Sequence, residues 1–226
     1  MSRANPARNR MRVLIVDDHP MTRAGLVHVI NHEPDLTVCA QAENAADALD
    51  AVYAREPDLV LADITLPGKS GLELVKDIRA MRPGLPILVI SMHDESLYAE
   101  RVLRAGARGY ITKHEGGKKL IQAIRQVLSG QIYVSEKMSA QILETFSGGQ
   151  AGSVRSLIAQ LSDREFEVFE LLGEGLSARA IAGRLHLSTK TVDVHRANIK
   201  VKLAIKTTSE LISYAARWIE HRANSK

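Results

Sequence analysis

The chain has 226 residues, of which 45% are hydrophobic and 25% charged, and its formal net charge is +4. These values are typical of a soluble globular protein with one large domain or two small ones. No apolar run approaches the roughly 18 residues of a membrane span, and no apolar signal-peptide core follows the basic N-terminus. The single cysteine, Cys39, excludes an internal disulfide and a cysteine-cluster zinc site. The composition therefore predicts a cytoplasmic protein without a membrane partner.

The first 130 residues alternate between short apolar runs and patterns of helical period. The strand-like runs are Val13–Val16, Leu36–Ala40, Leu59–Ala62, Ile87–Ser91 and Gly109–Thr112. The helical patterns are Met21–Asn31, Ala45–Arg55, Gly71–Met81, Ser96–Ala105 and Lys118–Leu128. Five strand-then-helix units favour a parallel sheet that is covered on both faces. The sequence therefore predicts an α/β fold with a doubly wound five-stranded parallel sheet, which binds ligands beyond the carboxyl ends of its strands.

Carboxylates follow two strands that such a sheet places side by side. Asp17 and Asp18 end the first strand in VLIVDDHP, and Asp63 ends the third in LVLAD. Three like charges at one edge repel each other, so a cation is expected among them, and Mg2+ prefers oxygen ligands of this kind when a phosphate also binds. Taken alone, an aspartate at a strand end is more often a turn or cap residue.

A hydroxyl and an ammonium group reach the same edge of the sheet. Ser91 ends the fourth strand, and Lys113 follows the fifth in GYITK. With the acidic residues they predict a phosphoryl-transfer site, in which Asp63 is the nucleophile and Ser91 and Lys113 bind the oxygens of the transferred group. The alternative is a phosphatase with an aspartate nucleophile. Such enzymes usually place a second acid two residues after the nucleophile, where this chain has Thr65.

The pattern changes after residue 130. A helix is expected at about Ser135–Glu144, followed by the glycine-rich stretch Thr145–Arg155, which is predicted to be a flexible linker. Beyond it no strand pattern is convincing, and Ser162 and Glu165 form a capping box that opens a helix. Four helices are expected there, beginning at Ser162, Ser177, Ser188 and Ser209, and the middle two form a helix-turn-helix. The second half is thus predicted to be an all-α four-helix domain.

Positive charge gathers in this second half. Residues 1–130 carry 17 Lys+Arg against 16 Asp+Glu, whereas residues 151–226 carry 12 against 8. Between Arg179 and Lys206 there are seven basic residues and one acidic residue, Asp193. This balance suits the phosphates of double-stranded DNA, although scattered charges also occur on any solvated helix face.

The helix from Ser188 to about Leu203 is the predicted recognition helix. Val192, Ile199 and Leu203 have the spacing of a buried stripe, which leaves the opposite side to enter the major groove. Basic residues at its surface would position the domain on phosphates without reading sequence. The predicted DNA-contacting residues are Lys190, Thr191, Asp193, Val194, Arg196, Ala197, Lys200 and Lys202.

The motifs of the first half resemble those of a known family. VLIVDDHP, LADITLPGKSG, VISMHDE and GYITK are similar to motifs of the receiver domain of two-component response regulators, which has a flavodoxin-like fold. The resemblance implies that Asp63 accepts phosphate from a sensor histidine kinase. It also implies that Asp18, Asp63 and the Thr65 carbonyl ligate Mg2+ directly, while Asp17 acts through water.

The same resemblance implies a switch. Ser91 and Tyr110 match the family's switch pair, in which the hydroxyl moves to the phosphate and the ring turns inward. The alternative for Tyr110 is a half-buried aromatic residue on an edge strand. A pseudo-receiver without a working switch is a further alternative, against which the complete acidic set and Lys113 argue.

The second half resembles the LuxR-type helix-turn-helix over LSDREFEVFELLGEGLSARAIAGRLHLSTKTVDVHRANIKVKL. Together the two resemblances indicate the NarL/FixJ subfamily. The implied domains are a receiver at 12–130, a helix and linker at 131–156, and a DNA-binding domain at 157–222. The two resemblances imply a phosphorylation-switched transcription regulator, in which phosphorylation releases the DNA-binding domain or favours a homodimer. No enzymatic activity is implied beyond phosphoryl acceptance and slow autodephosphorylation, and RNA polymerase is a further candidate partner.

Two positions depart from the family pattern. Many relatives carry lysine where this chain has Asp193, and a long polar residue where it has Ala197. A carboxylate repels phosphate and can only accept hydrogen bonds, so Asp193 would read the N4 amine of cytosine if it reached a base. Alternatively, Asp193 points at the scaffold or pairs with a neighbouring arginine.

Overall fold

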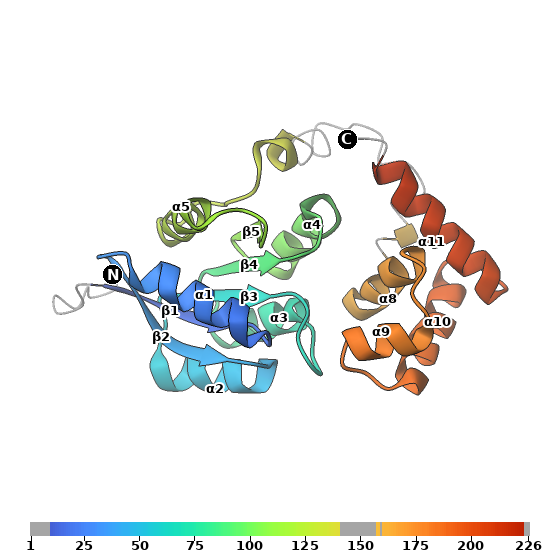
Figure 1. The fold of residues 1–226 in the computed structure, drawn as a ribbon, viewed down its shortest axis with the longest axis horizontal. Coiled ribbons are helices and arrows are strands. Elements are labelled where there is room, and N and C mark those ends of the chain that lie inside the picture. The colour runs from blue at the N-terminus through green and yellow to red at the C-terminus, as the bar shows by residue number, and fades with distance from the viewer. Residues whose placement is uncertain (1–9, 141–156, 159, 224–226) are drawn as a thin grey trace. The chain divides into compact units, whose positions relative to one another are not determined.

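The computed structural model describes residues 10–140, 157–158 and 160–223, and the side chains of these as far as residue 220. The chain divides into two compact units, Met1–Leu143 and Glu144–Lys226. Figure 1 shows a sheet surrounded by helices in the first unit and a cluster of helices in the second. The predicted linker at 145–155 lies outside the described residues.

The first unit contains the predicted parallel sheet. Its strands lie in the order β2-β1-β3-β4-β5, and every pair of neighbours is parallel. Crossing from β1 to β3 at the centre reverses the direction in which strands are added, so the carboxyl ends of these two strands meet at the ligand-binding edge. The strands are β1 (Met11–Val16), β2 (Leu36–Ala42), β3 (Leu59–Asp63), β4 (Ile87–Ser91) and β5 (Gly109–Thr112).

Helices cover both faces of the sheet, as predicted. One face packs against α1 and α5 through alternate strand residues such as Ile15 and Leu61. The other face packs against α2, α3 and α4, which lie side by side. The helices are α1 (Pro20–Asn31), α2 (Ala45–Arg55), α3 (Gly71–Met81), α4 (Glu95–Ala105) and α5 (Gly117–Leu128).

The pairing of β1 with β2 contains one irregularity. Val13 pairs with Val38, but Leu14 pairs with Ala40, so Cys39 is an extra residue in β2. This β-bulge locally increases the twist of the edge strand. It was not predicted from the sequence, because the apolar pattern of a strand fixes its faces and does not reveal an inserted residue.

The described part of the second unit contains the helices α8 (Asp163–Gly173), α9 (Ala178–Arg184), α10 (Thr189–Lys202) and α11 (Thr208–Ala223). Serine residues cap three of them: Ser162, Ser177 and Ser188 accept main-chain N–H groups of α8, α9 and α10. The rings of Phe166 and Phe169 pack edge-on against Trp218, with centroid distances of 5.7 and 5.5 Å. These contacts join α8 to α11 and form the core beneath the helix-turn-helix of α9 and α10.

Most predicted boundaries agree with the structure to within two residues. The largest difference is α11, which reaches Ala223, four residues beyond the predicted Ile219. Residues 136–140 are helical, as expected for the helix before the linker, and residues 141–144 of the predicted helix lie outside the described residues. Among the described helices, none has the length and apolar character needed to cross a bilayer.

Candidate functional site

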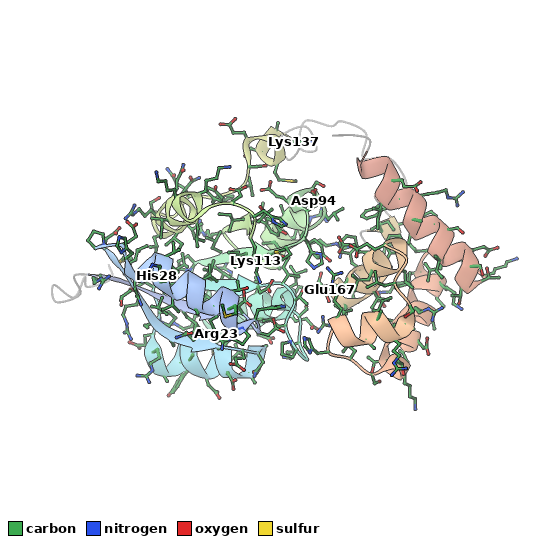
Figure 2. All side chains as sticks on the ribbon, in the orientation of Figure 1. Arg23, His28, Asp94, Lys113, Lys137 and Glu167 are labelled. Carbon is green, nitrogen blue, oxygen red and sulfur yellow. The ribbon has the colours of Figure 1, made fainter. Side chains whose placement is uncertain are left out.

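The carboxyl ends of β1, β3 and β5 bring two acids and one lysine together. The Lys113 ammonium lies 2.6 Å from Asp63 Oδ2 and 2.7 Å from Asp17 Oδ2. Both aspartates are buried, with relative exposures of 3% for Asp63 and 0% for Asp17. Figure 2 shows Lys113 among the loops at this edge of the sheet. The three residues that the sequence placed at separate strand ends are therefore in direct contact.

One ammonium group between two carboxylates leaves a negative charge unbalanced. Burial raises the pKa of Asp63; Lys113 lowers it and the charge of Asp17 raises it, so that the net shift is upward. Burial lowers the pKa of Lys113, but Asp63 and Asp17 raise it by more, so this lysine stays charged. The unbalanced negative charge of this buried cluster favours binding of a cation, and Lys113 keeps a positive charge beside the Asp63 carboxylate.

Asp18 and His19 complete the acidic edge. His19 Nδ1 lies 2.7 Å from Asp18 Oδ1, and the His19 main-chain N–H donates to Asp17 Oδ1 at 2.8 Å. One ligand atom from each of Asp17, Asp18, His19 and Asp63 lies within 4.8 Å of the others. Three carboxylates this close fit a small hard cation such as Mg2+, which takes oxygen ligands. His19 was not predicted as a site residue, although it comes directly after the acidic pair.

Arg23 holds the main chain at Asp17, the first residue of the acidic pair. Its Nη1 donates to the Asp17 main-chain oxygen at 2.7 Å, and its Nη2 pairs with Glu43 Oε1 at 2.6 Å. The guanidinium therefore ties the end of β1 to the loop after β2. This contact joins residues far apart in the sequence, and no local pattern predicted it.

The loop after Asp63 approaches the main chain of β3 very closely. A Cβ atom on Gly71 would lie 2.0 Å from the Asp63 carbonyl oxygen, so only glycine fits at the start of α3. Gly71 N–H donates to Ile64 O at 2.7 Å, which closes the loop. Within it, Thr65 N–H donates to Asp63 Oδ1 at 3.4 Å. The loop thus holds the carboxylate of Asp63 at the edge formed by the carboxyl ends of the strands.

Ser91 and Tyr110 both bond to His93, in the loop between β4 and α4. Ser91 Oγ accepts the His93 main-chain N–H at 3.2 Å, and the Tyr110 hydroxyl donates to the His93 main-chain oxygen at 2.8 Å. The His93 ring in turn lies 3.2 Å from Thr65 Oγ1. Tyr110 is fully buried, not half-buried. His93 occurs in VISMHDE, but its links to Ser91, Tyr110 and Thr65 run through main-chain and loop contacts that the motif does not reveal.

The predicted recognition helix, α10, has the buried stripe and the exposed face that its sequence predicted. Val192 and Ile199 are fully buried, whereas Lys190, Asp193, Val194 and Ala197 are exposed.

Three predicted DNA-contacting residues, Asp193, Arg196 and Lys202, form ion pairs within the second unit. Arg196 Nη1 lies 2.9 Å from Asp193 Oδ1, which is the pairing with an arginine that the sequence left open. Lys202 Nζ lies 2.6 Å from Glu165 Oε2, so its ammonium is directed at α8.

Comparison with protein families matches both units. Residues 13–125 match the response regulator receiver domain, and residues 159–215 match the bacterial regulatory proteins of the luxR family. The oxygen regulatory protein NreC of Staphylococcus carnosus (strain TM300) is 35% identical over 211 residues, which covers 92% of this chain and 97% of NreC.

Solved structures agree with this assignment. A LuxR-family two-component response regulator from Aurantimonas sp. SI85-9A1 is 36% identical with a TM-score of 0.57, covering 61% of this chain and 99% of its own. RcsB from Salmonella enterica serovar Typhimurium, bound to promoter rprA with the phosphomimetic BeF3-, is 25% identical with a TM-score of 0.61, covering 92% and 99%. Another RcsB structure, with 25% identity and a TM-score of 0.56 over 92% and 98%, holds two RcsB dimers on two parallel DNAs.

The match extends over both units and nearly the full length of a curated relative. It also agrees with the acidic edge of the sheet, which is typical of the receiver, and with the helix-turn-helix of the second unit. The chain therefore belongs to the NarL/FixJ family of two-component response regulators and is a transcriptional regulator with a receiver domain and a LuxR-type DNA-binding domain.

Proposed function

We propose that Asp63 is the residue that accepts the phosphoryl group. The observation that carries this proposal is the contact of Lys113 with both Asp63 and Asp17 at a buried sheet edge. In the transfer, an Asp63 carboxylate oxygen forms a bond to phosphorus while the bond from phosphorus to the donor's leaving atom breaks. For a sensor histidine kinase, the leaving group is the imidazole of its phosphohistidine.

The residues around Asp63 have distinct roles in this step. Lys113 is already beside the accepting oxygen and can bind the oxygens of the incoming group without crossing the site. Ser91, once its hydroxyl leaves the His93 N–H, can bind another. Asp17, Asp18, Asp63 and the Thr65 carbonyl would hold Mg2+, which supplies positive charge between the carboxylates and the phosphoryl group.

Phosphorylated Asp63 is a transient state of the receiver. An acyl phosphate on Asp63 is slowly hydrolysed when water attacks phosphorus, which restores the carboxylate. While it persists, we propose that the protein forms a homodimer on paired DNA half-sites, in the cytoplasm. RcsB, whose solved structures include dimers on DNA, supports this proposal. A bound dimer would act on transcription through contact with RNA polymerase.

The decisive experiment combines acetyl phosphate and Mg2+ with intact-mass spectrometry. One slowly gained phosphoryl group per chain, absent in Asp63→Asn, is the expected result. Asn keeps the shape of Asp and removes the nucleophile. If Asp63→Asn still gains one equivalent, the assignment is wrong.

Two other outcomes point to other classes of protein. Rapid multiple turnover of acetyl phosphate would indicate a phosphatase, and no labelling would indicate a pseudo-receiver. Genome-wide mapping of bound DNA, with wild type and Asp63→Asn compared, would then identify the target sites and show whether occupancy depends on this residue.

A further inference from the structure

The chain that leaves the receiver runs along the free edge of the sheet. After α5 it turns at Gly130, whose φ is +87°, and residues 130–135, here called the strap, lie beside β5. Arg108 Nη1 donates to the Gly130 oxygen at 2.9 Å, and Gln126 Nε2 donates to the Ile132 oxygen at 2.7 Å. Side chains from both neighbouring elements thus hold the main chain of the strap.

Tyr133 pairs with β5 as a short additional strand would. Its N–H donates to the Arg108 oxygen at 3.0 Å, and its oxygen accepts the Tyr110 N–H at 2.9 Å. A Cβ atom on Gly109 would lie 2.7 Å from the Tyr133 oxygen and 3.1 Å from Tyr133 Cβ. Glycine at 109 is therefore what lets the strap approach close enough to make both bonds.

Tyr110 is consequently held from two sides. Its main chain bonds to the strap, and its hydroxyl bonds to His93, whose N–H in turn bonds to Ser91 Oγ. When the Ser91 hydroxyl turns to a phosphoryl group on Asp63, the His93 N–H loses its acceptor. A change at the phosphorylation site thereby reaches Tyr110 through bonds, and the next bonded partner of Tyr110 is Tyr133.

Two glutamates link the strap to other parts of the receiver. Glu95, in the first turn of α4, accepts the Ser135 N–H at 2.8 Å. Burial raises the pKa of the Tyr133 phenol, and the charges of Glu115, two residues after Lys113, and of Glu95 raise it further. The strap thus contacts α4, α5 and β5. It continues directly into the helical residues 136–140, which come before the second unit in the chain.

We propose that the strap positions Tyr110 and passes the state of Asp63 to the segment that leads to the DNA-binding domain. Gly109 and Tyr133 are positioning residues in this scheme, because they act through Tyr110. The inference rests on the proposed function, since it requires phosphorylation at Asp63. Coupling between two sites is reciprocal, so loosening the strap must also change how tightly the receiver holds a phosphoryl mimic.

Hydrogen exchange in the full-length protein, with and without beryllofluoride and Mg2+, tests whether the state of Asp63 reaches the strap. Loading is expected to change the exchange rates of the amides of Tyr110, Tyr133 and Ser135 by about fivefold or more, the lower range of typical couplings between sites. Mass-spectrometric detection of acetyl phosphate labelling is run in parallel. Asp63 labelling without any change in strap exchange would overturn the strap proposal alone, whereas absent labelling would overturn the proposed function.

Two variants test whether the strap is needed to pass this state on to DNA binding. Gly109→Ala places a methyl group against the Tyr133 oxygen, and Glu95→Ala removes the acceptor of Ser135. The matched controls are Gly84→Ala, where an added Cβ meets nothing within 4 Å, and Glu100→Ala, which removes an exposed carboxylate paired with Arg104 on the same helix.

The variants are read by their affinity for beryllofluoride and for a DNA fragment chosen by binding-site selection. In wild type, we expect binding of beryllofluoride to raise the affinity for DNA, and both variants should lose most of that increase. Their affinity for beryllofluoride should shift by about fivefold. Without beryllofluoride, their DNA affinity should equal that of wild type. The controls should match wild type. Glu95→Ala leaves the core intact, so it decides the matter if Gly109→Ala does not fold. The proposal is wrong if Glu95→Ala leaves unchanged both the affinity for beryllofluoride and the increase in DNA affinity that beryllofluoride causes.

Discussion

Asp193 and Arg196 form an ion pair on the face of α10 that should meet DNA. The carboxylate is 61% exposed and the guanidinium side chain 20% exposed, and they lie 2.9 Å apart. Pairs this exposed contribute little to stability. We expect a larger effect on DNA binding, because Asp193 neutralises Arg196 and its carboxylate repels phosphate.

Asp193→Ala is therefore expected to bind non-specific DNA more tightly, since it removes a negative charge and releases Arg196 for phosphate. Lys190→Ala is the comparison: it should weaken binding about equally on all sequences and lower the salt dependence by about one unit of slope. Titrations at several salt concentrations measure both effects.

Binding-site selection decides whether Asp193 also reads a base. A carboxylate that accepts from cytosine N4 would make Asp193→Ala lose discrimination at one base pair per half-site, by roughly 1–3 kcal/mol. Identical preferred motifs for the two proteins would mean that Asp193 serves only to hold Arg196.

At the scale of the element, the capping box at the start of α8 is reinforced from α10. Ser162 and Glu165 exchange hydrogen bonds between side chains and main-chain N–H groups, and Lys202 adds an ion pair to Glu165. Burial raises the pKa of Glu165, but the bonds from Lys202 and Ser162 outweigh it, and the net pKa is lowered. The folded second unit therefore favours the ionised form of this glutamate.

This shift predicts a pH dependence of stability. A carboxyl group whose pKa is lowered by folding contributes stability that is present above its unfolded pKa of about 4.3 and is lost as pH falls through the lower folded value. We expect Lys202→Gln to reduce the urea midpoint of the second unit at pH 7 and to have a smaller effect near pH 3. Emission of Trp218, the protein's single tryptophan, reports unfolding of this unit. An equal loss at both pH values would show that Lys202 does not act through the charge of Glu165.

The strands and helices could be predicted closely from the sequence, because each was specified by a local pattern. Short apolar runs specified the buried parallel strands, and Ser162, Ser177 and Ser188 marked helix starts by their caps. The bulge at Cys39 and the pairing of Tyr133 with β5 were not predicted. Both depend on main-chain contacts between segments distant in sequence, which side-chain periodicity does not encode.

For the candidate site, the order of charged residues along the chain was sufficient to place Asp17, Asp63 and Lys113 together, because neighbouring parallel strands end at one edge. The roles of His19 and His93 were not predicted. Their positions depend on loop conformations, and histidine at a loop carries no pattern that distinguishes a contact with Asp18 or Thr65 from exposure to solvent.

At the scale of the whole molecule, the receiver and the DNA-binding domain are separate units, each with its own core. Under the proposed function, phosphorylation of the first would change the second by bringing two chains together. Two tethered DNA-binding domains then bind paired half-sites with a gain from effective concentration that one domain lacks.

We therefore expect phosphorylation to double the mass measured by light scattering and to tighten DNA binding over the same range of protein concentration. Asp63→Asn under the same conditions is the control and should stay at its original mass. If DNA affinity rose while the mass stayed unchanged, release of a masked recognition helix would replace dimerisation as the explanation.

The bulge in β2 has a practical consequence for monitoring these changes. Cys39, the extra residue of the bulge, is half-buried, and burial raises the pKa of its thiol. Because the thiolate is the form that reacts with maleimides, Cys39 should be labelled slowly at neutral pH. Val201, on α10, is 81% exposed, so a Val201→Cys protein should accept a fluorophore at that position selectively while the native cysteine remains in place. Energy transfer between two such labelled chains would then report the approach of their recognition helices as the receiver is phosphorylated.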